Sequence, residues 1–388
     1  MTMLLLHAGR VLTPTAEIAD AGILIREEQI EEIGPRAGMR LPSGAAEISA
    51  TGQTAVPGFL DVHIHGAGGR DVMEGTAEAL GSMAKTVARH GTTSVVATTV
   101  TASPNATIRS VEGIARYISE QHAAADPRAE VLGIHFEGPF LSPARRGVHP
   151  AEWLTLPSAD FLERLMHAAA GKGLILTIAP ELLGAAPCIA AARKAGLVVA
   201  MGHTDATYEQ ARAGIANGVR HAVHAYNAMR PFSHRDSGVI GAVMTSPEVS
   251  AELIADGVHV DEAAMRMLLH AKGANGTILI SDGLSATGMP DGKYALGEFE
   301  VTVSGGVCRN AEGRLAGSTL TLDRALRNIV SLGTPLADAV RMLTLNPATL
   351  LGLEFKKGAL RAGADADIVL LDESLQIAGV WARGVALN

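Results

Sequence analysis

The sequence is poor in cysteine and in aromatic residues. Of 388 residues, only two are cysteine and 3% are aromatic. Cys188 and Cys308 lie 120 residues apart, with no second cysteine or histidine at ligand spacing, so we expect both thiols to be reduced and inert. With 47% apolar and 19% charged residues, the composition excludes disorder, a coiled coil and a disulfide-rich miniprotein.

Long apolar runs and an excess of positive charge are also absent. No stretch approaches the ~18 consecutive apolar residues of a membrane span. Lysine and arginine number 32 against 40 aspartates and glutamates, and the net charge of −8 argues against a nucleic-acid or membrane surface. The first residues lack the basic segment of a signal peptide, and their apolar run breaks at His7 and Gly9. We therefore expect a cytoplasmic protein with neither nucleic-acid nor membrane partners.

From Val56 onward, short apolar runs alternate with segments of helical period, which is typical of a parallel sheet with helices between its strands. The runs are Gly58–Ile64, Ser94–Val100, Val131–Phe136, Leu174–Ala179, Leu197–Met201, Ala222–Tyr226, Ala251–Ala255 and Thr277–Ser281. Eight such strands predict a TIM-like (β/α)8 barrel over residues 56–355. The alternation stops after Asp282, where Gly283–Gly317 contains one strand-like segment, Glu298–Val303, before a helical stretch.

The two ends of the chain differ from this pattern. Residues 1–55 consist of short alternating segments separated by turn residues, and residues 356–388 again indicate a turn followed by a strand. Because the tail is short for a domain of its own, we expect it to complete the β unit that residues 1–55 begin. The predicted fold class is therefore α/β, a barrel with a small β-sandwich domain built from both chain termini.

Side chains that bind metals follow several of the predicted strands. In a barrel of this type, the chemistry lies at the C-terminal ends of the strands. Imidazoles and carboxylates gathered there form a ligand set for a borderline divalent cation such as Zn²⁺. These residues are His63 and His65 in and after the first run, Glu137 after the third, His203 after the fifth, His224 in the sixth and Asp282 after the eighth.

Spacing separates these histidines from two of their neighbours. His63 and His65 are two residues apart on a strand, so both side chains share one face and can contact one ion. His135 lies two residues before Glu137, where we expect a hydrogen bond in the barrel core. His221 alternates with Val223 and is expected to face away from the site, on the outer face or at the start of its strand.

Seven segments of the chain resemble the amidohydrolase superfamily and, within it, the N-acetylglucosamine-6-phosphate deacetylases. They are Pro57–Gly69, His135–Phe140, Gly202–Ala206, His224–Met229, Ala255–His259, Ser281–Gly283 and Leu315–Ser318. The His-x-His pair and the late aspartate are shared across the superfamily, whereas Glu-Gly-Pro-Phe and His-Ala-Tyr-Asn-Ala-Met are more specific. Many amidohydrolases have a carboxylated lysine at the bridging position, where this chain resembles the deacetylases in having a glutamate.

The resemblance implies a metal-dependent hydrolase that converts N-acetyl-D-glucosamine 6-phosphate and water to D-glucosamine 6-phosphate and acetate. Asp282 matches the catalytic acid/base. The positions that match metal ligands are Glu137, His203 and His224 for a primary ion, and His63 and His65 for a second ion that some family members lack. One ion or two therefore stays open. Zn²⁺ is the expected ion, with Fe²⁺, Mn²⁺ and Co²⁺ as alternatives.

The same resemblance implies the substrate contacts. The matching positions are Asn227, the backbone of Ala228 and Arg235 for the phosphate, and His149 and His259 for the rest of the substrate. In similar enzymes the arginine can reach across a dimer interface, and we expect a homodimer. Arg145 and Arg146 are alternative cations for the phosphate. We expect His149 to polarise the acetamide carbonyl, the other interpretation being a solvent-exposed loop residue.

Three other functions compete with this interpretation. The nearest is deacetylation of the galactosamine 6-phosphate epimer, because the orientation of one hydroxyl group is not legible in a sequence. Another metal-dependent amidohydrolase, such as a cyclic-imide hydrolase or an N-acyl amino acid deacylase, fits the glutamate at position 137 less well. A non-catalytic scaffold on the same fold should lack one or more ligands, whereas every ligand position here holds a competent residue.

Overall fold

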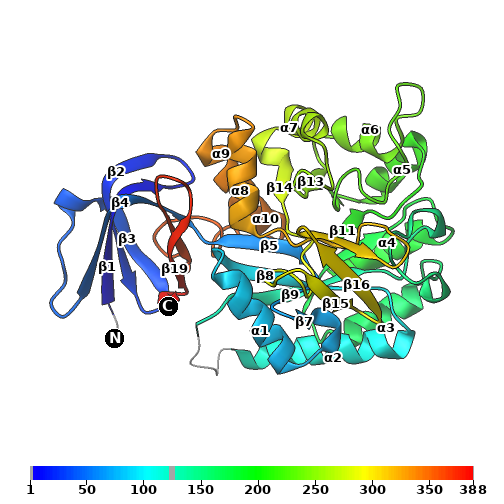
Figure 1. Cartoon of the computed structure of the whole chain (residues 1–388), viewed down its shortest axis with the longest axis horizontal. Helices are drawn as coiled ribbons and strands as arrows, with labels where there is room; N and C mark the ends of the chain where they lie inside the picture. The colour runs from blue at the N-terminus through cyan, green and yellow to red at the C-terminus, as the bar shows by residue number, and fades with distance from the viewer. Residues whose placement is uncertain (1–2, 122–126, 388) are drawn as a thin grey trace.

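The computed structural model describes residues 3–121 and 127–387, which form a barrel and a smaller β domain at its side (Figure 1). Eight parallel strands form the barrel in the order β14-β13-β12-β11-β10-β9-β8-β5. They are β5 (Phe59–Ile64), β8 (Thr92–Thr99), β9 (Glu130–Glu137), β10 (Gly173–Ile178), β11 (Val198–Met201), β12 (His221–Ala222), β13 (Ser250–Leu253) and β14 (Thr277–Leu279). Backbone hydrogen bonds from Asp282 to His63 and from His65 to Gly283 join the two ends of this order. The predicted (β/α)8 architecture is confirmed.

Helices follow the barrel strands in sequence and surround them. The helices are α1 (Ala77–Ala88), α2 (Pro104–Glu120), α3 (Ala159–Ala168), α4 (Ala185–Lys194), α5 (Tyr208–Asn217), α6 (Gly238–Met244), α7 (Glu262–Gly276), α8 (Leu322–Ser331), α9 (Leu336–Leu343) and α10 (Leu345–Leu350). Their starts follow ordinary capping chemistry. The Ser103 side chain accepts from the Ala106 amide ahead of Pro104, and Thr207 forms a capping box with Gln210. Within the described residues, no helix has the length and apolar character needed to span a bilayer.

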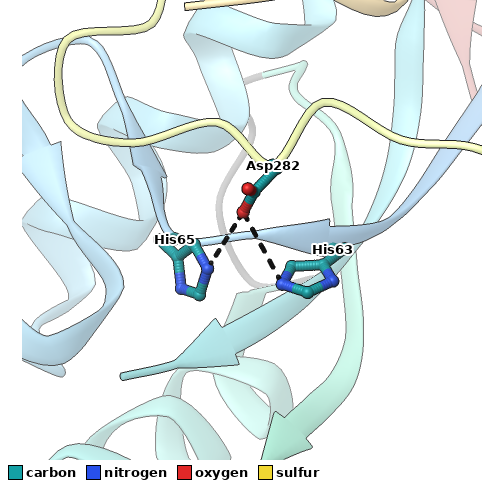
Figure 2. A group of neighbouring side chains, drawn as sticks. All are labelled: His63, His65 and Asp282. Carbon is teal, nitrogen blue, oxygen red and sulfur yellow. Dashed lines mark ion pairs between the residues drawn. The ribbon is translucent and has the colours of Figure 1, made fainter. Parts of the chain in front are cut away.

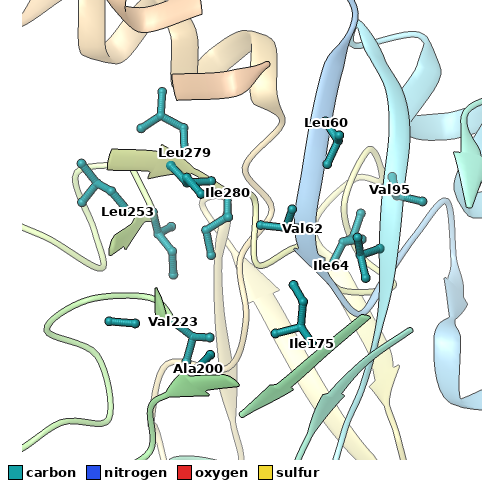
Figure 3. Close-up of a cluster of buried hydrophobic side chains, with 14 of the residues drawn as sticks. Leu60, Val62, Ile64, Val95, Ile175, Ala200, Val223, Leu253, Leu279 and Ile280 are labelled. Carbon is teal, nitrogen blue, oxygen red and sulfur yellow. The ribbon is translucent and has the colours of Figure 1, made fainter. Parts of the chain in front are cut away.

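The barrel strands are buried on both faces, as parallel strands covered by helices require. Every residue of β5 and β8 is buried. Figure 3 shows the apolar side chains that the strands contribute to one cluster, among them Val62, Ile175 and Leu253. This layer fixes the strands on which the polar residues of the site stand.

One predicted strand is wrong in its extent. The sixth run was expected to be extended over Ala222–Tyr226, but β12 stops at Ala222. His224 and Tyr226 adopt positive φ angles of 28° and 76°, which a strand does not allow. The chain therefore turns where the periodicity indicates a continuing strand.

The β domain is a seven-stranded sheet in the order β20-β19-β18-β4-β1-β2-β3. Its strands are β1 (Met3–Leu12), β2 (Glu17–Arg26), β3 (Gln29–Pro35), β4 (Ala46–Pro57), β18 (Ile368–Leu371), β19 (Ile377–Ala382) and β20 (Val385–Leu387). The tail strand β18 pairs with β4, so the blue and red ends of the chain lie side by side in Figure 1. Ile25 and Ile30 share one buried cluster with Ile368 and Trp381, so the sheet curls around its own core. The limits 1–55 with 356–388, and 56–355, stay a prediction.

A three-stranded insertion follows the last barrel strand. It consists of β15 (Gly292–Leu296), β16 (Phe299–Ser304) and β17 (Val307–Asn310), drawn in gold in Figure 1. A short ribbon, β6 (Gly66–Ala67) and β7 (Arg70–Asp71), follows β5. The Asp71 carboxylate accepts from the Gly297 amide at 2.9 Å and so ties this ribbon to the insertion. Together they border the mouth of the barrel, by which we mean the C-terminal ends of its strands.

Candidate metal centre

The polar residues predicted from the strand ends meet in one cavity of about 180 Å³ at the barrel mouth. His65, Glu137, His203, His224 and Asp282 line it, together with apolar Val100, Leu296 and Leu315. His63 lies directly beneath and is fully buried. Residues up to 219 positions apart in the chain thus converge, as the barrel topology predicts.

Glu137, the last residue of β9, lies at the centre of the group and is only 2% exposed. Its Oε1 atom is 3.0 Å from His224 Nε2, 3.2 Å from His203 Nε2 and 3.4 Å from His63 Nε2. Its Oε2 atom is 3.3 Å from His65 Nε2. One carboxylate therefore touches both predicted ligand groups.

Asp282 points toward His63 and His65 (Figure 2). Its Oδ1 atom is 3.2 Å from His65 Nε2 and 3.7 Å from His63 Nε2. Although burial disfavours its charge, the hydrogen bond with His65 and the charges of His63 and His65 hold the pKa of Asp282 below its usual value. The aspartate is thus an ionised proton acceptor at the edge of the cavity.

Hydrogen bonds at Nδ1 fix the orientation of three imidazoles. Nδ1 of His65 lies 3.2 Å from the Thr98 carbonyl, and Nδ1 of His203 lies 3.0 Å from the Arg145 carbonyl. A carbonyl only accepts, so these Nδ1 atoms carry protons. Nδ1 of His63 lies 2.8 Å from the Glu252 carboxylate and likewise carries the ring proton. Each ring therefore directs Nε2 toward the centre, the arrangement that metal-ligating histidines adopt.

The donor set fits a divalent cation. His63 Nε2 is buried without a hydrogen-bond partner, and the Nε2 atoms of His203 and His224 lie 3.1 Å apart. Because Nδ1 of His224 is also buried without a partner, the two Nε2 atoms can share either a proton or a metal ion. Ligand atoms of His63, His65 and Asp282, and of His63, Glu137 and His224, lie within 4.8 Å of one another. Mixed nitrogen and oxygen donors of this kind suit Zn²⁺ and its neighbours in the first transition row.

The electrostatics of the group favour positive charge. Burial opposes a charged imidazole, but hydrogen bonds to Asp282 and Glu137 raise the pKa of His65 to about 9. Glu137 and Glu252 likewise raise the pKa of His63 well above its usual value against the effect of burial. The carboxylates thus stabilise a positive charge at the Nε2 atoms. Either protons or a metal ion can supply this charge.

His149 has the opposite tautomer. Its Nδ1 atom lies 3.2 Å from the backbone nitrogen of Thr101, and an amide only donates, so the ring proton is on Nε2. Burial lowers the pKa of His149 to about 4, which keeps the ring neutral. Nε2 lies 3.6 Å from Glu137 Oε2. The residue is only 3% exposed, so the alternative of a solvent-exposed loop residue is wrong.

The predicted substrate contacts are only partly brought together. Asn227, Ala228 and His259 line the cavity, and within the described residues no group accepts from the Ala228 amide. The His259 ring is fixed by Asp256, whose Oδ2 lies 2.7 Å from Nδ1. Arg235, by contrast, is exposed on the loop before α6 and is not part of the cavity lining.

The two alternative phosphate cations already have partners. Arg145 donates to Asp205 at 2.7 Å, and Arg146 donates to the His149 carbonyl at 2.8 Å. Both arginines therefore support the loop that carries His149. Neither is among the residues that line the cavity.

Several non-glycine residues of this site have left-handed backbone conformations. Among non-glycine residues, His203, Ala228 and Asp282 have φ angles of 45°, 50° and 50°, in addition to His224. Such conformations are unfavourable by roughly 1 kcal/mol or more and persist only where the surroundings enforce them. Here they turn side chains and one amide into the barrel mouth.

Two expectations for the barrel interior have different outcomes. His135 forms the expected core hydrogen bond, with Nε2 2.7 Å from Thr177 Oγ1, and burial lowers its pKa to about 3. His221 begins β12, as one of its two predicted alternatives has it, but it does not lie on the outer face, because its Nε2 atom is 2.9 Å from Glu252 inside the barrel. Glu252 itself was missed. The signal was available, since it is the only acidic residue within the apolar stretch Val249–Ala255.

Comparisons with known proteins agree with this geometry. The sequence profile of the amidohydrolase family matches residues 54–387. An N-acetylglucosamine-6-phosphate deacetylase of Vibrio furnissii is 40% identical over 330 residues, covering 85% of this chain and 82% of that protein. An N-acetylgalactosamine-6-phosphate deacetylase of Escherichia coli O157:H7 is 36% identical over 380 residues, covering 98% of each.

A solved structure has the same fold over the whole chain. It is a mutant N-acetyl-D-glucosamine-6-phosphate deacetylase of Mycobacterium smegmatis in complex with N-acetyl-D-glucosamine 6-phosphate. It superposes with a TM-score of 0.92 at 36% identity and covers 100% of both chains.

Proposed function

The chain belongs to the amidohydrolase family, and from that membership we propose that it removes the acetyl group from N-acetyl-D-glucosamine 6-phosphate to give D-glucosamine 6-phosphate and acetate. The observation that carries the proposal is the buried Glu137 carboxylate among the Nε2 atoms of His63, His65, His203 and His224, with Asp282 beside them. The deacetylase relatives support the substrate class.

Glu137, His203 and His224 would hold a primary divalent ion, and His63 and His65, next to the same carboxylate, would hold a second. We expect Zn²⁺, with Fe²⁺, Mn²⁺ and Co²⁺ as alternatives, and one or two ions per subunit. Such an ion supplies Lewis acidity for water activation and for polarising the acetamide carbonyl. Proton transfer and hydrogen bonding to the carbonyl oxygen are carried out by protein side chains.

Asp282 moves the proton. Because its carboxylate is ionised, it can accept a proton from the attacking water as the new C–O bond forms. It then gives this proton to the amide nitrogen as the C–N bond breaks, so that the amine and acetate leave. His149 donates its Nε2 proton in a hydrogen bond to the carbonyl oxygen, on which negative charge develops.

The phosphate contacts extend from the same cavity. The free Ala228 amide and the Asn227 side chain lie at the barrel mouth, and His259 is oriented toward it by Asp256. We propose that Arg235 adds a charge-assisted contact to the phosphate. Its exposed position suits a contact across a homodimer interface, and we expect that dimer in the cytoplasm.

A second candidate substrate is the galactosamine epimer. It is favoured by one observation, the 36% identity over 98% of both chains with an N-acetylgalactosamine-6-phosphate deacetylase. The two substrates need the same reaction and the same ions. A comparison of kcat/KM on the two epimers decides between them.

Acetate release measured together with metal content tests the proposal. We expect the wild-type protein, loaded with each of the four ions in turn, to release acetate from at least one epimer. Asp282→Asn should lower kcat by about 10²- to 10⁴-fold while the primary ion is retained, because the proton acceptor is lost. Asp160→Asn, exposed on α3, is the matched control and should retain the full rate. The proposal fails if the wild type releases no acetate, or if Asp282→Asn is as fast as the wild type.

A further inference from the structure

Glu252 is a carboxylate in the barrel interior that no step above uses. It lies on β13 and is fully buried. Burying a carboxylate is costly unless it is paired and hydrogen-bonded, so its surroundings should account for it. Glu252 does not line the cavity and therefore does not reach substrate.

Three hydrogen bonds meet at the two oxygens of this carboxylate. Oε2 lies 2.8 Å from His63 Nδ1 and accepts from the backbone amide of His224 at 2.9 Å. Oε1 lies 2.9 Å from Nε2 of His221, whose Nδ1 is 2.8 Å from the Ser250 hydroxyl. His221 thus anchors one oxygen, while the other contacts two residues of the metal centre.

These contacts have a consequence for each of the two residues. The bond at His63 Nδ1 keeps the proton there and leaves Nε2, which has no other hydrogen bond, facing Glu137 and Asp282. The bond to the His224 amide holds the chain where it leaves β12 and turns through a positive φ. A single carboxylate therefore connects a ligand side chain of the second position with the backbone of a ligand at the primary position.

We infer that Glu252 is a positioning residue that makes the His63 and His65 position competent to hold a second divalent ion. The inference rests on the proposed function, because it assumes that the centre holds metal. Removal of the carboxylate leaves the His63 ring free to rotate and to change tautomer, whereas the carbonyl contacts that orient His65 and His203 stay intact. We expect the loss to fall on the second ion.

The competing explanation is that Glu252 only neutralises His221 in the barrel core. A glutamine separates the two explanations. Its carbonyl oxygen can accept from His63 and from the His224 amide, while its NH2 group donates to His221, which changes tautomer. Glu252→Gln therefore keeps the geometry and removes the charge, whereas Glu252→Ala removes both.

The experiment counts ions and measures their affinity in the apoprotein titrated with Zn²⁺ against a chelator indicator. We expect two ions per wild-type chain. In Glu252→Ala, the second ion should bind about 10- to 100-fold more weakly, as is typical when the hydrogen-bond partner of a ligand is removed, while the first binds as in the wild type. Glu252→Gln should retain the second ion more tightly than Glu252→Ala.

Asp323→Asn is the matched control, since Asp323 is a buried carboxylate that pairs with Arg327 and His90, away from the centre. It should bind both ions like the wild type. If Glu252→Ala fails to fold, Glu252→Met, which fills the space but offers no acceptor to His63 or to the His224 amide, takes its place, and a second ion bound there as tightly as in Asp323→Asn would overturn the inference. Equal weakening of both ions would also overturn it, as would a wild-type chain that binds one ion at saturation. Acetate release by that wild-type chain reports separately on the proposed function.

Discussion

At the scale of single residues, the partner of each Nδ1 atom divides the histidines of the site into two kinds. His65 and His203 donate Nδ1–H hydrogen bonds to backbone carbonyls and turn Nε2 toward the carboxylates, where a metal ion can replace a proton. Nδ1 of His149 accepts a hydrogen bond from a backbone amide, so the ring presents Nε2–H. The first kind suits metal ligation, and the second suits donation to a carbonyl oxygen.

This division predicts how His149 can be replaced. His149→Ala should lower kcat by about 10²- to 10³-fold, the usual effect of losing one donor to a developing oxyanion. His149→Gln keeps an N–H donor and should retain at least ten times the kcat of the alanine variant. Steady-state kinetics and metal content of both variants provide the measurement. Equal activity of the two variants would show that donation from this position does not matter.

The sequence predicts which residues come together at the centre, but it does not predict which nitrogen of each histidine carries the proton. His63, Glu137 and Asp282 could be found because strand ends converge in a barrel, whatever the loops do. The tautomers depend on which backbone group happens to face each ring, and that is set by tertiary structure. His221 was placed on the wrong face because the chain turns at His224, so alternation counted back from His224 does not give the orientation of β12 residues.

At the scale of elements, the insertion β15–β17 borders the cavity through the end of its first strand. Leu296 lines the cavity, and the amide of the next residue, Gly297, donates to Asp71. The other Asp71 oxygen accepts from Met73 at 2.7 Å. Asp71 therefore holds the insertion to the segment that follows His65.

Asp71→Ala should loosen the cavity end of the insertion. We expect faster amide hydrogen exchange in residues 292–310 and a fall in kcat/KM of about tenfold, because Leu296 no longer excludes water from the reacting groups. Asp291→Ala is a matched control, since Asp291 accepts from Gly305 and Gly306 at another turn of the insertion. It should speed exchange at those residues without changing kcat/KM. A wild-type kcat/KM in Asp71→Ala would contradict the prediction.

Elements buried on both faces were predictable, and half-exposed ones less so. β8 is buried at every residue and β9 at six of its eight, and each carries a short apolar run that stands out in the sequence. In the insertion only the region of β16 was expected, because its partners β15 and β17 are short and carry few apolar residues. Such strands form through pairing with a neighbour, which local sequence does not encode.

At the scale of the whole molecule, a buried lysine joins the β domain to the barrel. Lys357 is 4% exposed, and its Nζ atom lies 2.7 Å from Glu130 on β9, 2.9 Å from Asp365 and 2.8 Å from Asp367. The two aspartates precede β18, the tail strand of the β domain. The sequence predicted that the tail returns to the N-terminal strands, but Lys356 and Lys357 resemble an ordinary surface turn, so the ion cluster could not be foreseen.

Removal of the charge of Lys357 should destabilise the protein, whereas the same substitution at Lys356 should not. Lys357→Met removes the cation from Asp365 and Asp367, and we expect a loss of about 3–5 kcal/mol in the free energy of unfolding, measured by urea denaturation at pH 8. Burial already raises the pKa of Asp367 even with Lys357 beside it. Without the lysine, the pKa of Asp367 should rise further. A group whose pKa is raised by folding destabilises the fold when ionised, so the loss should shrink as pH falls toward 5. Lys356→Met, an exposed neighbour, should unfold like the wild type at both pH values. A loss that does not change between pH 8 and pH 5 would place the role of Lys357 in packing and not in its charge.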